Sequence, residues 1–285
     1  MMKKIWKLTL PSDRTQTVRQ LIANWEIPKR YYYLLRQDQR ILINGHYQSP
    51  DVIVPAGSQV TLTIGADDFK TRQAYVPDHH RQLPVLFENR DVVVINKPRG
   101  IKSHPNQPGE TGTVMNYATA QFGTAYMVHR LDQQTSGAMM IAKHPLAVPL
   151  LNKHLVDHSI HRDYTAVVAG DLQGTGQITL PIGQHPTDPR KRQVDGLNAQ
   201  PAITNYQVVA HSATKSIVEL NLQTGRTHQI RVHLAALGHP ILGDPLYHPH
   251  PTGPMQLHAH QLTLVLPFTH EVVQVAAPLP PDFTN

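Results

Sequence analysis

An aspartate flanked by basic residues is the side chain of this 285-residue sequence best placed to do chemistry. Asp132 lies in the stretch HRLDQQTSG at residues 129–137, which precedes the apolar run 138–142. This pattern predicts a tight turn that leads into a buried strand, with Gly137 where the backbone must pass closely. The positive charge of Arg130 favours the ionised carboxylate. Such a carboxylate serves as a nucleophile, a base, a metal ligand or a turn cap, and these residues alone leave all four roles open.

A second stretch with chemical capacity is LQTGRTHQIRVHL, at residues 222–234. Its composition predicts a turn at Gly225 and a helix that is capped by Thr227 and ends near Gly238. Such a helix is preceded by a polar turn and would present its amide groups to an anion.

The basic side chains of this helix would lie at its N-terminal end. Arg226 precedes the helix, and His228 and Arg231 share one face because they are three residues apart. A helix N-terminus with two arginines attracts a carboxylate or a phosphate. A surface pair of arginines without a ligand fits the same residues equally well.

Other polar residues carry weaker signals. Lys97 follows the apolar strand 91–95 and suits a Schiff base or a phosphate contact, but the adjacent Pro98 favours a structural turn. His154 and His158 stand four apart on a predicted helix, but no acidic residue accompanies them as in helical zinc motifs. With nineteen histidines in the chain, chance pairs are common, so we expect no metal site.

Composition narrows the class of protein. There is no cysteine, which excludes disulfides and thiolate sites and fits a cytoplasmic location. The sequence contains no run of eighteen apolar residues, so we expect no membrane span. Lys7 interrupts the apolar run near the start, so we expect no secretory signal. Residues 1–75 hold eleven basic and six acidic residues, whereas residues 76–285 hold fifteen and fourteen. The basic first segment indicates a polyanionic partner or merely a soluble basic surface.

The first segment predicts a small α/β module. Apolar spacing indicates helices at residues 15–25 and after Pro28, followed by short strands at 41–43, 52–54 and 60–64. This order resembles the ribosomal-protein-S-four-like RNA-binding module, and a small accessory domain that binds no RNA is the alternative.

The remaining chain predicts a second, larger domain. Residues 66–84 are polar, contain two prolines and lack periodicity, which is typical of a linker. Beyond them, strands and turns alternate through residue 222 as in a mixed, largely antiparallel sheet. We therefore expect an α+β protein with a module at residues 1–67, a linker at 68–83 and a catalytic domain at 84–285.

Four stretches together carry a family resemblance that covers about residues 84–280. They resemble, in order and spacing, the RluA-type RNA pseudouridine synthases, with the N-terminal module of an RluD-like member: VVVINKPRGIKSHP (92–105), HRLDQQTSG (129–137), HRDYTAVVAG (161–170) and LQTGRTHQIRVHLAALGHPILGDPLY (222–247). The triplet at residues 257–259 fits as well. The resemblance implies a catalytic fold with a mixed sheet and flanking helices around a central cleft.

The resemblance also implies an activity and the residues that perform it. Uridine must lose its nitrogen glycosidic bond and regain the ribose through a ring carbon, without a metal or an organic cofactor. Asp132 would be the nucleophile, attacking either the ribose or the uracil ring, and Arg231 its charge partner. Tyr164 would lie beside the base as a stacking face and proton acceptor. The base must leave the RNA stack to be reached.

The same resemblance implies that Ile230 lies beneath the uracil and that Arg130 holds the place of the flipped-out nucleotide or its phosphate. We also expect Arg226, His228, Arg162 and Lys97 to bind the substrate. Two positions depart from the family: Gln133-Gln134 stand where Arg-Asp is frequent, and His161 stands where Lys is usual. Both changes would alter phosphate contacts.

The sequence leaves more than one RNA substrate and more than one class of function open. The expected partner is RNA, with large-subunit ribosomal RNA favoured over transfer RNA because of the appended module. A binding or ribosome-assembly protein without turnover, and a histidine-rich metal hydrolase, are the alternatives from other classes. The sequence does not give the oligomeric state, and a monomer is plausible.

Overall fold

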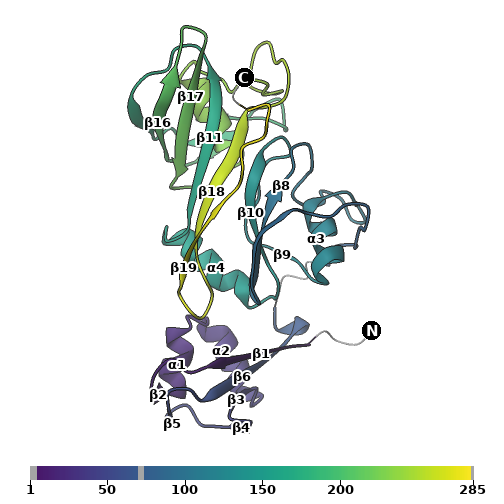
Figure 1. Ribbon diagram of the computed structural model, residues 1–285, viewed down its shortest axis with the longest axis vertical. Helices are drawn as coiled ribbons and strands as arrows, with labels where there is room; N and C mark the ends of the chain where they lie inside the picture. The colour runs from purple at the N-terminus through teal and green to yellow at the C-terminus, as the bar shows by residue number, and fades with distance from the viewer. Residues whose placement is uncertain (1–4, 70–73, 284–285) are drawn as a thin grey trace.

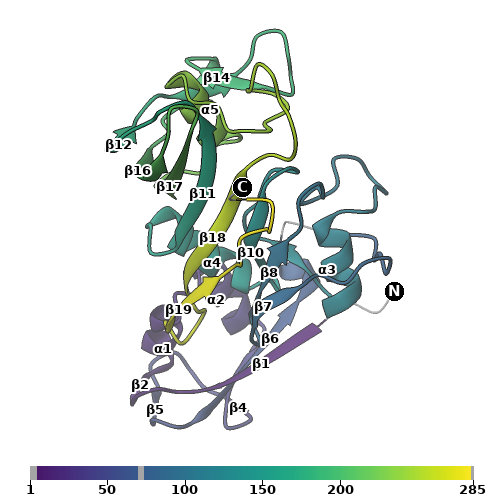
Figure 2. The same ribbon diagram turned by 45° about the horizontal axis from the view of Figure 1, so that its top comes forward.

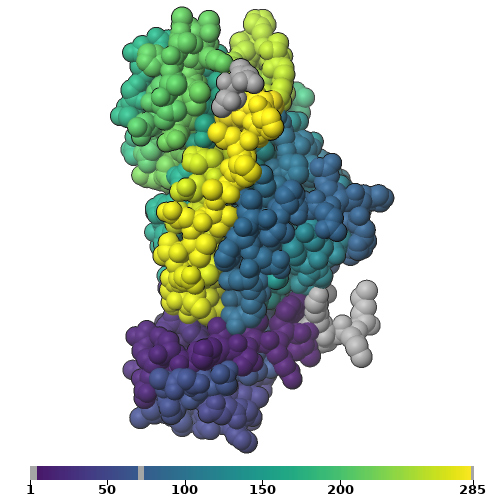
Figure 3. Space-filling model, in the orientation of Figure 1, coloured from purple at the N-terminus to yellow at the C-terminus, as the bar shows by residue number. Residues whose placement is uncertain are grey.

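The computed structural model describes residues 5–69 and 74–283. A small N-terminal part lies at one end of an elongated molecule, and a larger part built on a long curved sheet forms the rest (Figure 1). The space-filling view shows the two parts in direct contact (Figure 3).

The N-terminal part combines two helices with short strands in residues 5–69. Its elements are β1 (Ile5–Pro11), β2 (Gln16–Thr17), α1 (Val18–Asn24), α2 (Lys29–Gln37), β3 (Ile41–Ile43), β4 (His46–Tyr47), β5 (Ile53–Val54), β6 (Gln59–Gly65) and the 3-10 turn η1 (Ala66–Asp68). The strands β1, β6, β3 and β4 form one antiparallel sheet in that order. The predicted helix pair and strands are therefore confirmed.

Local chemistry explains where α1 begins. The side chain of Thr17 accepts a hydrogen bond from the backbone of Gln20, and the Gln20 side chain accepts one from the Thr17 backbone. This capping box satisfies two amide groups that the first turn would leave free. The apolar residues Val18, Leu21 and Ile22 then face the core of the module.

The larger part contains the remaining elements. Residues 74–283 form β7 (Val85–Glu88), β8 (Val92–Lys97), α3 (Val114–Phe122), β9 (Tyr126–Met127), β10 (Ser136–Ala142), α4 (Ala147–Val156), β11 (His161–Ala169), β12 (Thr175–Ile178), β13 (Ile182–Gln184), β14 (Arg192–Val194), β15 (Leu197–Gln200), β16 (Thr204–His211), β17 (Lys215–Leu222), α5 (Gln229–Ala236), β18 (Leu257–Val265) and β19 (Val272–Ala276).

The main sheet is mixed and mostly antiparallel. Its strand order is β12-β16-β17-β11-β18-β10-β8-β7, with β19 paired to β18 and β9 paired to β10. β10 and β18 run parallel, whereas the other pairs of this sheet are antiparallel among the described residues. α5 lies against one half of the sheet beside β14, and α3 flanks the other half near β8 (Figure 2). This arrangement confirms the predicted α+β class.

The parallel pair β10–β18 depends on a glycine. Gly137 lies opposite Ala259 and has a φ of 112°. A Cβ at this position would come within 2.2 Å of the Ala259 carbonyl oxygen. The predicted close passage of the backbone at Gly137 is confirmed, and it fixes the strand that directly follows the Asp132 loop.

The two parts share a hydrophobic core. Leu146 and Leu150 of the α4 segment and Phe268 of the β18–β19 turn pack with buried residues of the N-terminal part. The rings of Trp25 and Phe268 meet edge to face, with centroids 5.8 Å apart. The connecting segment also packs closely: Asp78 and Leu83 are buried. The domain limits expected at residues 67 and 84 stay a prediction.

The helices of the described residues are short. None of those in residues 5–69 and 74–283 is long and apolar enough to cross a membrane.

Candidate active site

A cleft of about 510 Å³ gathers most of the residues predicted for the site. It is lined by segments that lie far apart in the sequence, from the Asp132 loop, β11, the β17–α5 turn and the first turn of α5. The predicted residues on its wall are Arg130, Asp132, Arg162, Tyr164, Arg226, His228, Ile230 and Arg231. A neighbouring cleft of about 420 Å³ shares Asp132 and Arg231 and adds Lys102, His104 and Arg190.

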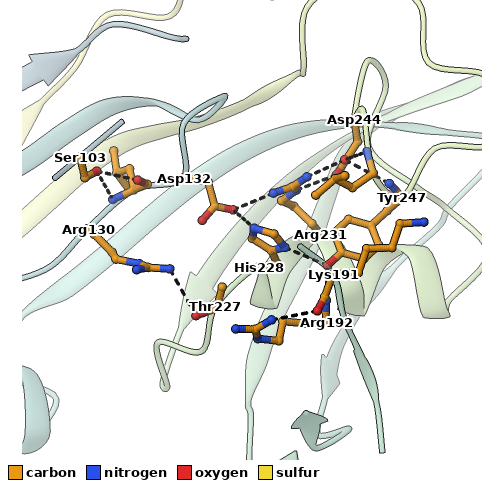
Figure 4. Close-up of polar contacts among 12 residues, drawn as sticks. Ser103, Arg130, Asp132, Lys191, Arg192, Thr227, His228, Arg231, Asp244 and Tyr247 are labelled. Carbon is orange, nitrogen blue, oxygen red and sulfur yellow. Dashed lines mark hydrogen bonds and ion pairs between the residues drawn. The ribbon is translucent and has the colours of Figure 1, made fainter. Parts of the chain in front are cut away.

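Asp132 and Arg231 form an ion pair between distant segments. A nitrogen of the Arg231 guanidinium lies 3.0 Å from Oδ2 of Asp132 (Figure 4). The Asp132 side chain keeps 17% of its surface exposed, whereas that of Arg231 is 4% exposed. The carboxylate can therefore meet a ligand in the cleft while its partner stays inside the protein.

A second carboxylate holds the guanidinium from behind. Asp244 is fully buried and accepts two hydrogen bonds from Arg231, of 2.8 Å from Nε and 2.7 Å from the terminal nitrogen. Burial would lower the pKa of Arg231, but the hydrogen-bonded Asp244 carboxylate and the Asp132 carboxylate raise it further than burial lowers it. Arg231 thus remains a fixed cation, since its planar group is held by one edge and points the other at Asp132.

His228 approaches the same carboxylate from another direction. Its Nε2 lies 3.7 Å from Oδ2 of Asp132, and its Nδ1 lies 2.8 Å from the Tyr247 hydroxyl. Burial lowers the pKa of His228 to about 4, so the ring is neutral at physiological pH. The Tyr247 oxygen accepts a 2.7 Å hydrogen bond from the Arg192 amide, which leaves its proton free for Nδ1. The other ring nitrogen of His228 faces Asp132 (Figure 4), and it carries the proton of the neutral ring when Tyr247 donates to Nδ1.

Tyr164 and Ile230 supply the apolar surface of the cleft. Tyr164 lies on β11 next to a register shift against β18, between Asp163 and Tyr164, and such irregularities re-aim side chains. Ile230 lies in the first turn of α5, and both side chains are about 95% buried in the protein alone. Burial raises the pKa of Tyr164, so its hydroxyl stays protonated at neutral pH.

Three arginines surround the cleft opening. Arg130 is exposed and donates a 3.4 Å hydrogen bond to the Thr227 hydroxyl across the opening. Arg226 is exposed and donates through Nε to the Pro201 carbonyl. Arg162 is half-buried, and its Nε has no hydrogen-bond partner. These cations give the cleft the charge that a phosphate backbone requires.

Lys97 is the exception among the predicted site residues. Its side chain is completely buried, and its Nζ donates to the carbonyl oxygens of Pro98, Gln133 and Thr135 at 3.1, 3.2 and 2.8 Å. Burial lowers the pKa of Lys97 to about 7. The expected RNA contact of Lys97 is wrong, because its Nζ is buried and donates to backbone carbonyl groups, two of which belong to the Asp132 loop. The structure supports the turn-stabilising alternative.

The predicted cap of α5 is also wrong. The helix starts at Gln229 after His228, whose φ of 59° lies in the left-handed region, and no side chain caps it. Thr227 instead accepts the hydrogen bond from Arg130. The left-handed turn is what directs the His228 ring toward Asp132.

Sequence reasoning missed three residues that support the site. Asp244 and Tyr247 lie at the end of the stretch 222–247. The sequence around Asp244 does not indicate that its carboxylate pairs with Arg231. Ser103 holds the Asp132 loop from the other side, since its hydroxyl donates to the Leu131 carbonyl at 2.6 Å and accepts from the Leu131 amide at 3.2 Å. These contacts join segments distant in sequence, so they follow from the fold alone.

Family models match both parts of the chain. Residues 91–236 match the RNA pseudouridylate synthase family, and residues 6–60 match the RluD ribosomal pseudouridine synthase N-terminal domain. The first match contains Asp132, Tyr164 and Arg231. The second covers the module that resembles an RNA-binding domain.

Relatives and solved structures agree with these matches. The chain is 39% identical to the uncharacterized RNA pseudouridine synthase YhcT of Bacillus subtilis, over 87% of this chain and 84% of that one. It is 34% identical to ribosomal large subunit pseudouridine synthase D of Escherichia coli K12, over 87% and 82%. The fold is similar to human RNA pseudouridylate synthase domain containing 1, with a TM-score of 0.62, 29% identity and coverage of 73% and 88%. The chain therefore belongs to the RluA-type RNA pseudouridine synthases, with an RluD-type N-terminal domain, and is an isomerase that acts on RNA.

Proposed function

We propose that this synthase modifies uridines of large-subunit ribosomal RNA. The N-terminal domain is of the type named for a ribosomal pseudouridine synthase, and relatives such as that of Escherichia coli K12 are named for the large ribosomal subunit. The exposed basic side chains Arg130 and Arg226 beside the cleft suit a folded RNA with phosphates on both sides.

The observation that carries the proposed mechanism is the buried guanidinium that holds Asp132 at the cleft wall. Asp132 is the nucleophile: one oxygen pairs with Arg231, and the carboxylate keeps partial access to the cleft. It attacks the ribose anomeric carbon or the uracil ring, the bond from N1 to the ribose breaks, and the detached base turns. A bond from C5 to the ribose then forms, and the bond between Asp132 and the ribose or the ring breaks, which restores the free carboxylate. The C5 proton leaves and N1 gains a proton, so the product is an isomer of the substrate.

The apolar wall of the cleft holds the base during this rearrangement. Tyr164 and Ile230 line the same cleft as Asp132 and offer an aromatic and an aliphatic surface to the base. The raised pKa of the buried Tyr164 hydroxyl favours the role of a contact face over that of a phenolate base. His228, neutral at physiological pH, faces Asp132 at 3.7 Å without adding a charge that would compete with Arg231.

The arginines at the opening hold the extruded nucleotide. A target base must leave its stack at a cost of a few kcal/mol, which backbone contacts offset. Arg130 bridges the opening to Thr227, and this long hydrogen bond is easily exchanged for a phosphate. Arg162, with an unpartnered Nε, is the second phosphate contact that we propose.

Pseudouridine mapping tests the proposed substrate. Total RNA from cells with the gene, without it, and without it but complemented by the Asp132→Asn variant is mapped for pseudouridine. We expect sites in large-subunit ribosomal RNA to vanish in the deletion strain and to stay absent with the variant. Loss of transfer RNA sites alone would overturn the ribosomal assignment while leaving the enzyme class intact.

A further inference from the structure

Three metal-ligating side chains meet at the junction of the two parts of the protein. Glu26 lies in the turn between α1 and α2, His154 lies on α4, and His270 lies in the turn between β18 and β19. Figure 1 shows these turns converging where the N-terminal helices meet the larger part. None of the three lines the synthase cleft.

The distances in this Glu26–His154–His270 cluster approach those of a coordination site. Oε2 of Glu26 lies 3.1 Å from Nε2 of His154 and 3.7 Å from Nε2 of His270. The three ligand atoms all lie within 4.8 Å of one another. Bonds of about 2.0–2.1 Å at tetrahedral angles separate ligand atoms by roughly 3.4 Å, so small side-chain shifts would complete the site.

The hydrogen bonds of His154 leave an unshared lone pair facing the carboxylate. Its Nδ1 lies 2.9 Å from the Ser159 hydroxyl, which itself donates to the Asp157 carboxylate. Ser159 must therefore accept from Nδ1–H, and Nε2 of the neutral ring carries no proton. Two lone pairs then face each other across 3.1 Å in a site where His154 is 6% exposed. A cation between them, either a proton or a metal ion, is required.

Outside this cluster, no hydrogen-bond donor reaches Oε2 of Glu26 among the described residues. Oε2 is buried without a hydrogen-bond partner, while the other oxygen pairs with Lys153 at 2.8 Å. Asp157 in turn pairs with Lys153 at 3.2 Å, which offsets part of the lysine charge. Glu26 and His270 both have left-handed backbone, with φ of 56° and 57°, a strained conformation that sites often retain. His270 is 40% exposed, so an ion can enter from solvent.

We propose that Glu26, His154 and His270 bind a divalent metal ion such as Zn²⁺, which links the N-terminal domain to the catalytic domain. Two imidazoles and a carboxylate suit Zn²⁺, with water at the fourth position. The Ser159–His154 hydrogen bond is the outer contact that fixes the ring of a metal-binding histidine. The ion would stabilise the junction and would take no part in the isomerisation.

Titration of the full-length protein with Co²⁺ tests this site, because tetrahedral Co²⁺ absorbs visible light strongly. We expect one Co²⁺ per chain with a tetrahedral spectrum that Zn²⁺ displaces. The His270→Gln variant, altered at a partly exposed side chain, should keep its circular dichroism and lose the spectrum. The matched control His46→Gln, on the exposed β4 strand of the N-terminal domain, should bind as the unaltered protein does.

Thermal unfolding provides the second measurement. Zn²⁺ at saturating concentration should raise the melting temperature of the unaltered protein and of His46→Gln, but not that of Glu26→Gln or His270→Gln, because a ligand stabilises only the state that binds it. An identical Co²⁺ spectrum in His270→Gln, or no spectrum in the unaltered protein, would overturn the proposal. In the second case a proton joins Glu26 and His154.

Discussion

At the scale of the residue, the site depends on a cation that touches two carboxylates. Arg231 has one edge bound to buried Asp244 and one nitrogen on Asp132. In an exposed ion pair the arginine could leave the carboxylate easily, since such pairs contribute only about 0–1 kcal/mol to stability. Here burial fixes the guanidinium, so the carboxylate has a charged partner in one place.

Replacing Arg231 tests that arrangement. In Arg231→Met, the buried Asp244 loses its partner, and we expect the free energy of unfolding to fall by about 3–5 kcal/mol. Among the molecules that remain folded, the single-turnover rate should fall on the order of 100-fold or more, whereas RNA affinity should stay within a few-fold. Quench-flow analysis of pseudouridine and filter binding measure the two quantities.

An arginine at the cleft opening provides the matched control. Arg226→Met removes an exposed cation that touches neither carboxylate. We expect weaker RNA binding with a reduced salt dependence and a nearly normal single-turnover rate at saturating RNA. A normal rate in folded Arg231→Met would refute the proposed role of Arg231.

Single residues differ in how far their position could be predicted. Asp132, Tyr164 and Arg231 were assigned to one site because short stretches around them resemble a family, and the structure brings them together in one cleft. Lys97, at the end of an apolar strand, is also predicted to bind the substrate, yet its Nζ is surrounded by three backbone carbonyl groups. Backbone acceptors have no sequence signature, which explains this error.

At the scale of the element, the β10–β18 pair positions the Asp132 loop. A Cβ on Gly137 would strike the Ala259 backbone, and the φ of Gly137 is unfavourable for other residues. We expect Gly137→Ala to cost well over about 3 kcal/mol or to prevent folding, since the clash adds to the backbone strain.

A glycine in open space isolates the effect of the clash. Gly174 also has positive φ, of 73°, but a Cβ there would have no neighbour within 4 Å. Gly174→Ala should therefore cost only about 1–2 kcal/mol in urea unfolding. Equal losses for the two variants would show that the close approach at Gly137 contributes little.

Elements with strong periodicity were predicted well, and irregular backbone was not. The spacing of Val18, Leu21 and Ile22 predicted α1, and the apolar run predicted β10. The left-handed His228 before α5 and the register shift beside Tyr164 were not predicted. Both irregularities depend on contacts with remote segments, and both direct site residues into the cleft.

At the scale of the whole molecule, the N-terminal domain is packed onto the catalytic domain. Phe268 and Leu146 are buried in a cluster with residues of the first seventy positions. The spacing of Leu146 and Leu150 predicts an inward-facing helix side but not which core it joins, since apolar patterning specifies burial and not a partner. The predicted linker limits and the cytoplasmic location stay predictions.

Histidines whose pKa values are lowered in the folded protein make its stability depend on pH. Burial lowers the pKa of His129 to about 3 and those of His228 and His258 to about 4, against 6.5 for the free side chain. Between pH 6.5 and 4 these three side chains therefore bind up to three more protons in the unfolded chain than in the native protein. Stability is full above pH 6.5 and is lost as pH falls, by up to about 4 kcal/mol per pH unit at about 1.4 kcal/mol per proton.

Urea unfolding at pH 7, 6 and 5 measures this loss. His228→Gln, which removes one of the three groups, should flatten the slope by about one proton. A free energy of unfolding that stays constant from pH 7 to 5 would contradict the burial of neutral histidines.

Pseudouridine formation by purified Asp132→Asn tests the central claim most directly. The variant keeps the size of the side chain and removes its nucleophilic charge. Under single-turnover conditions on large-subunit ribosomal RNA, we predict no pseudouridine, with RNA affinity within a few-fold of that of the unaltered protein. Formation of pseudouridine by Asp132→Asn at a rate near that of the unaltered protein would show that another group makes the bond.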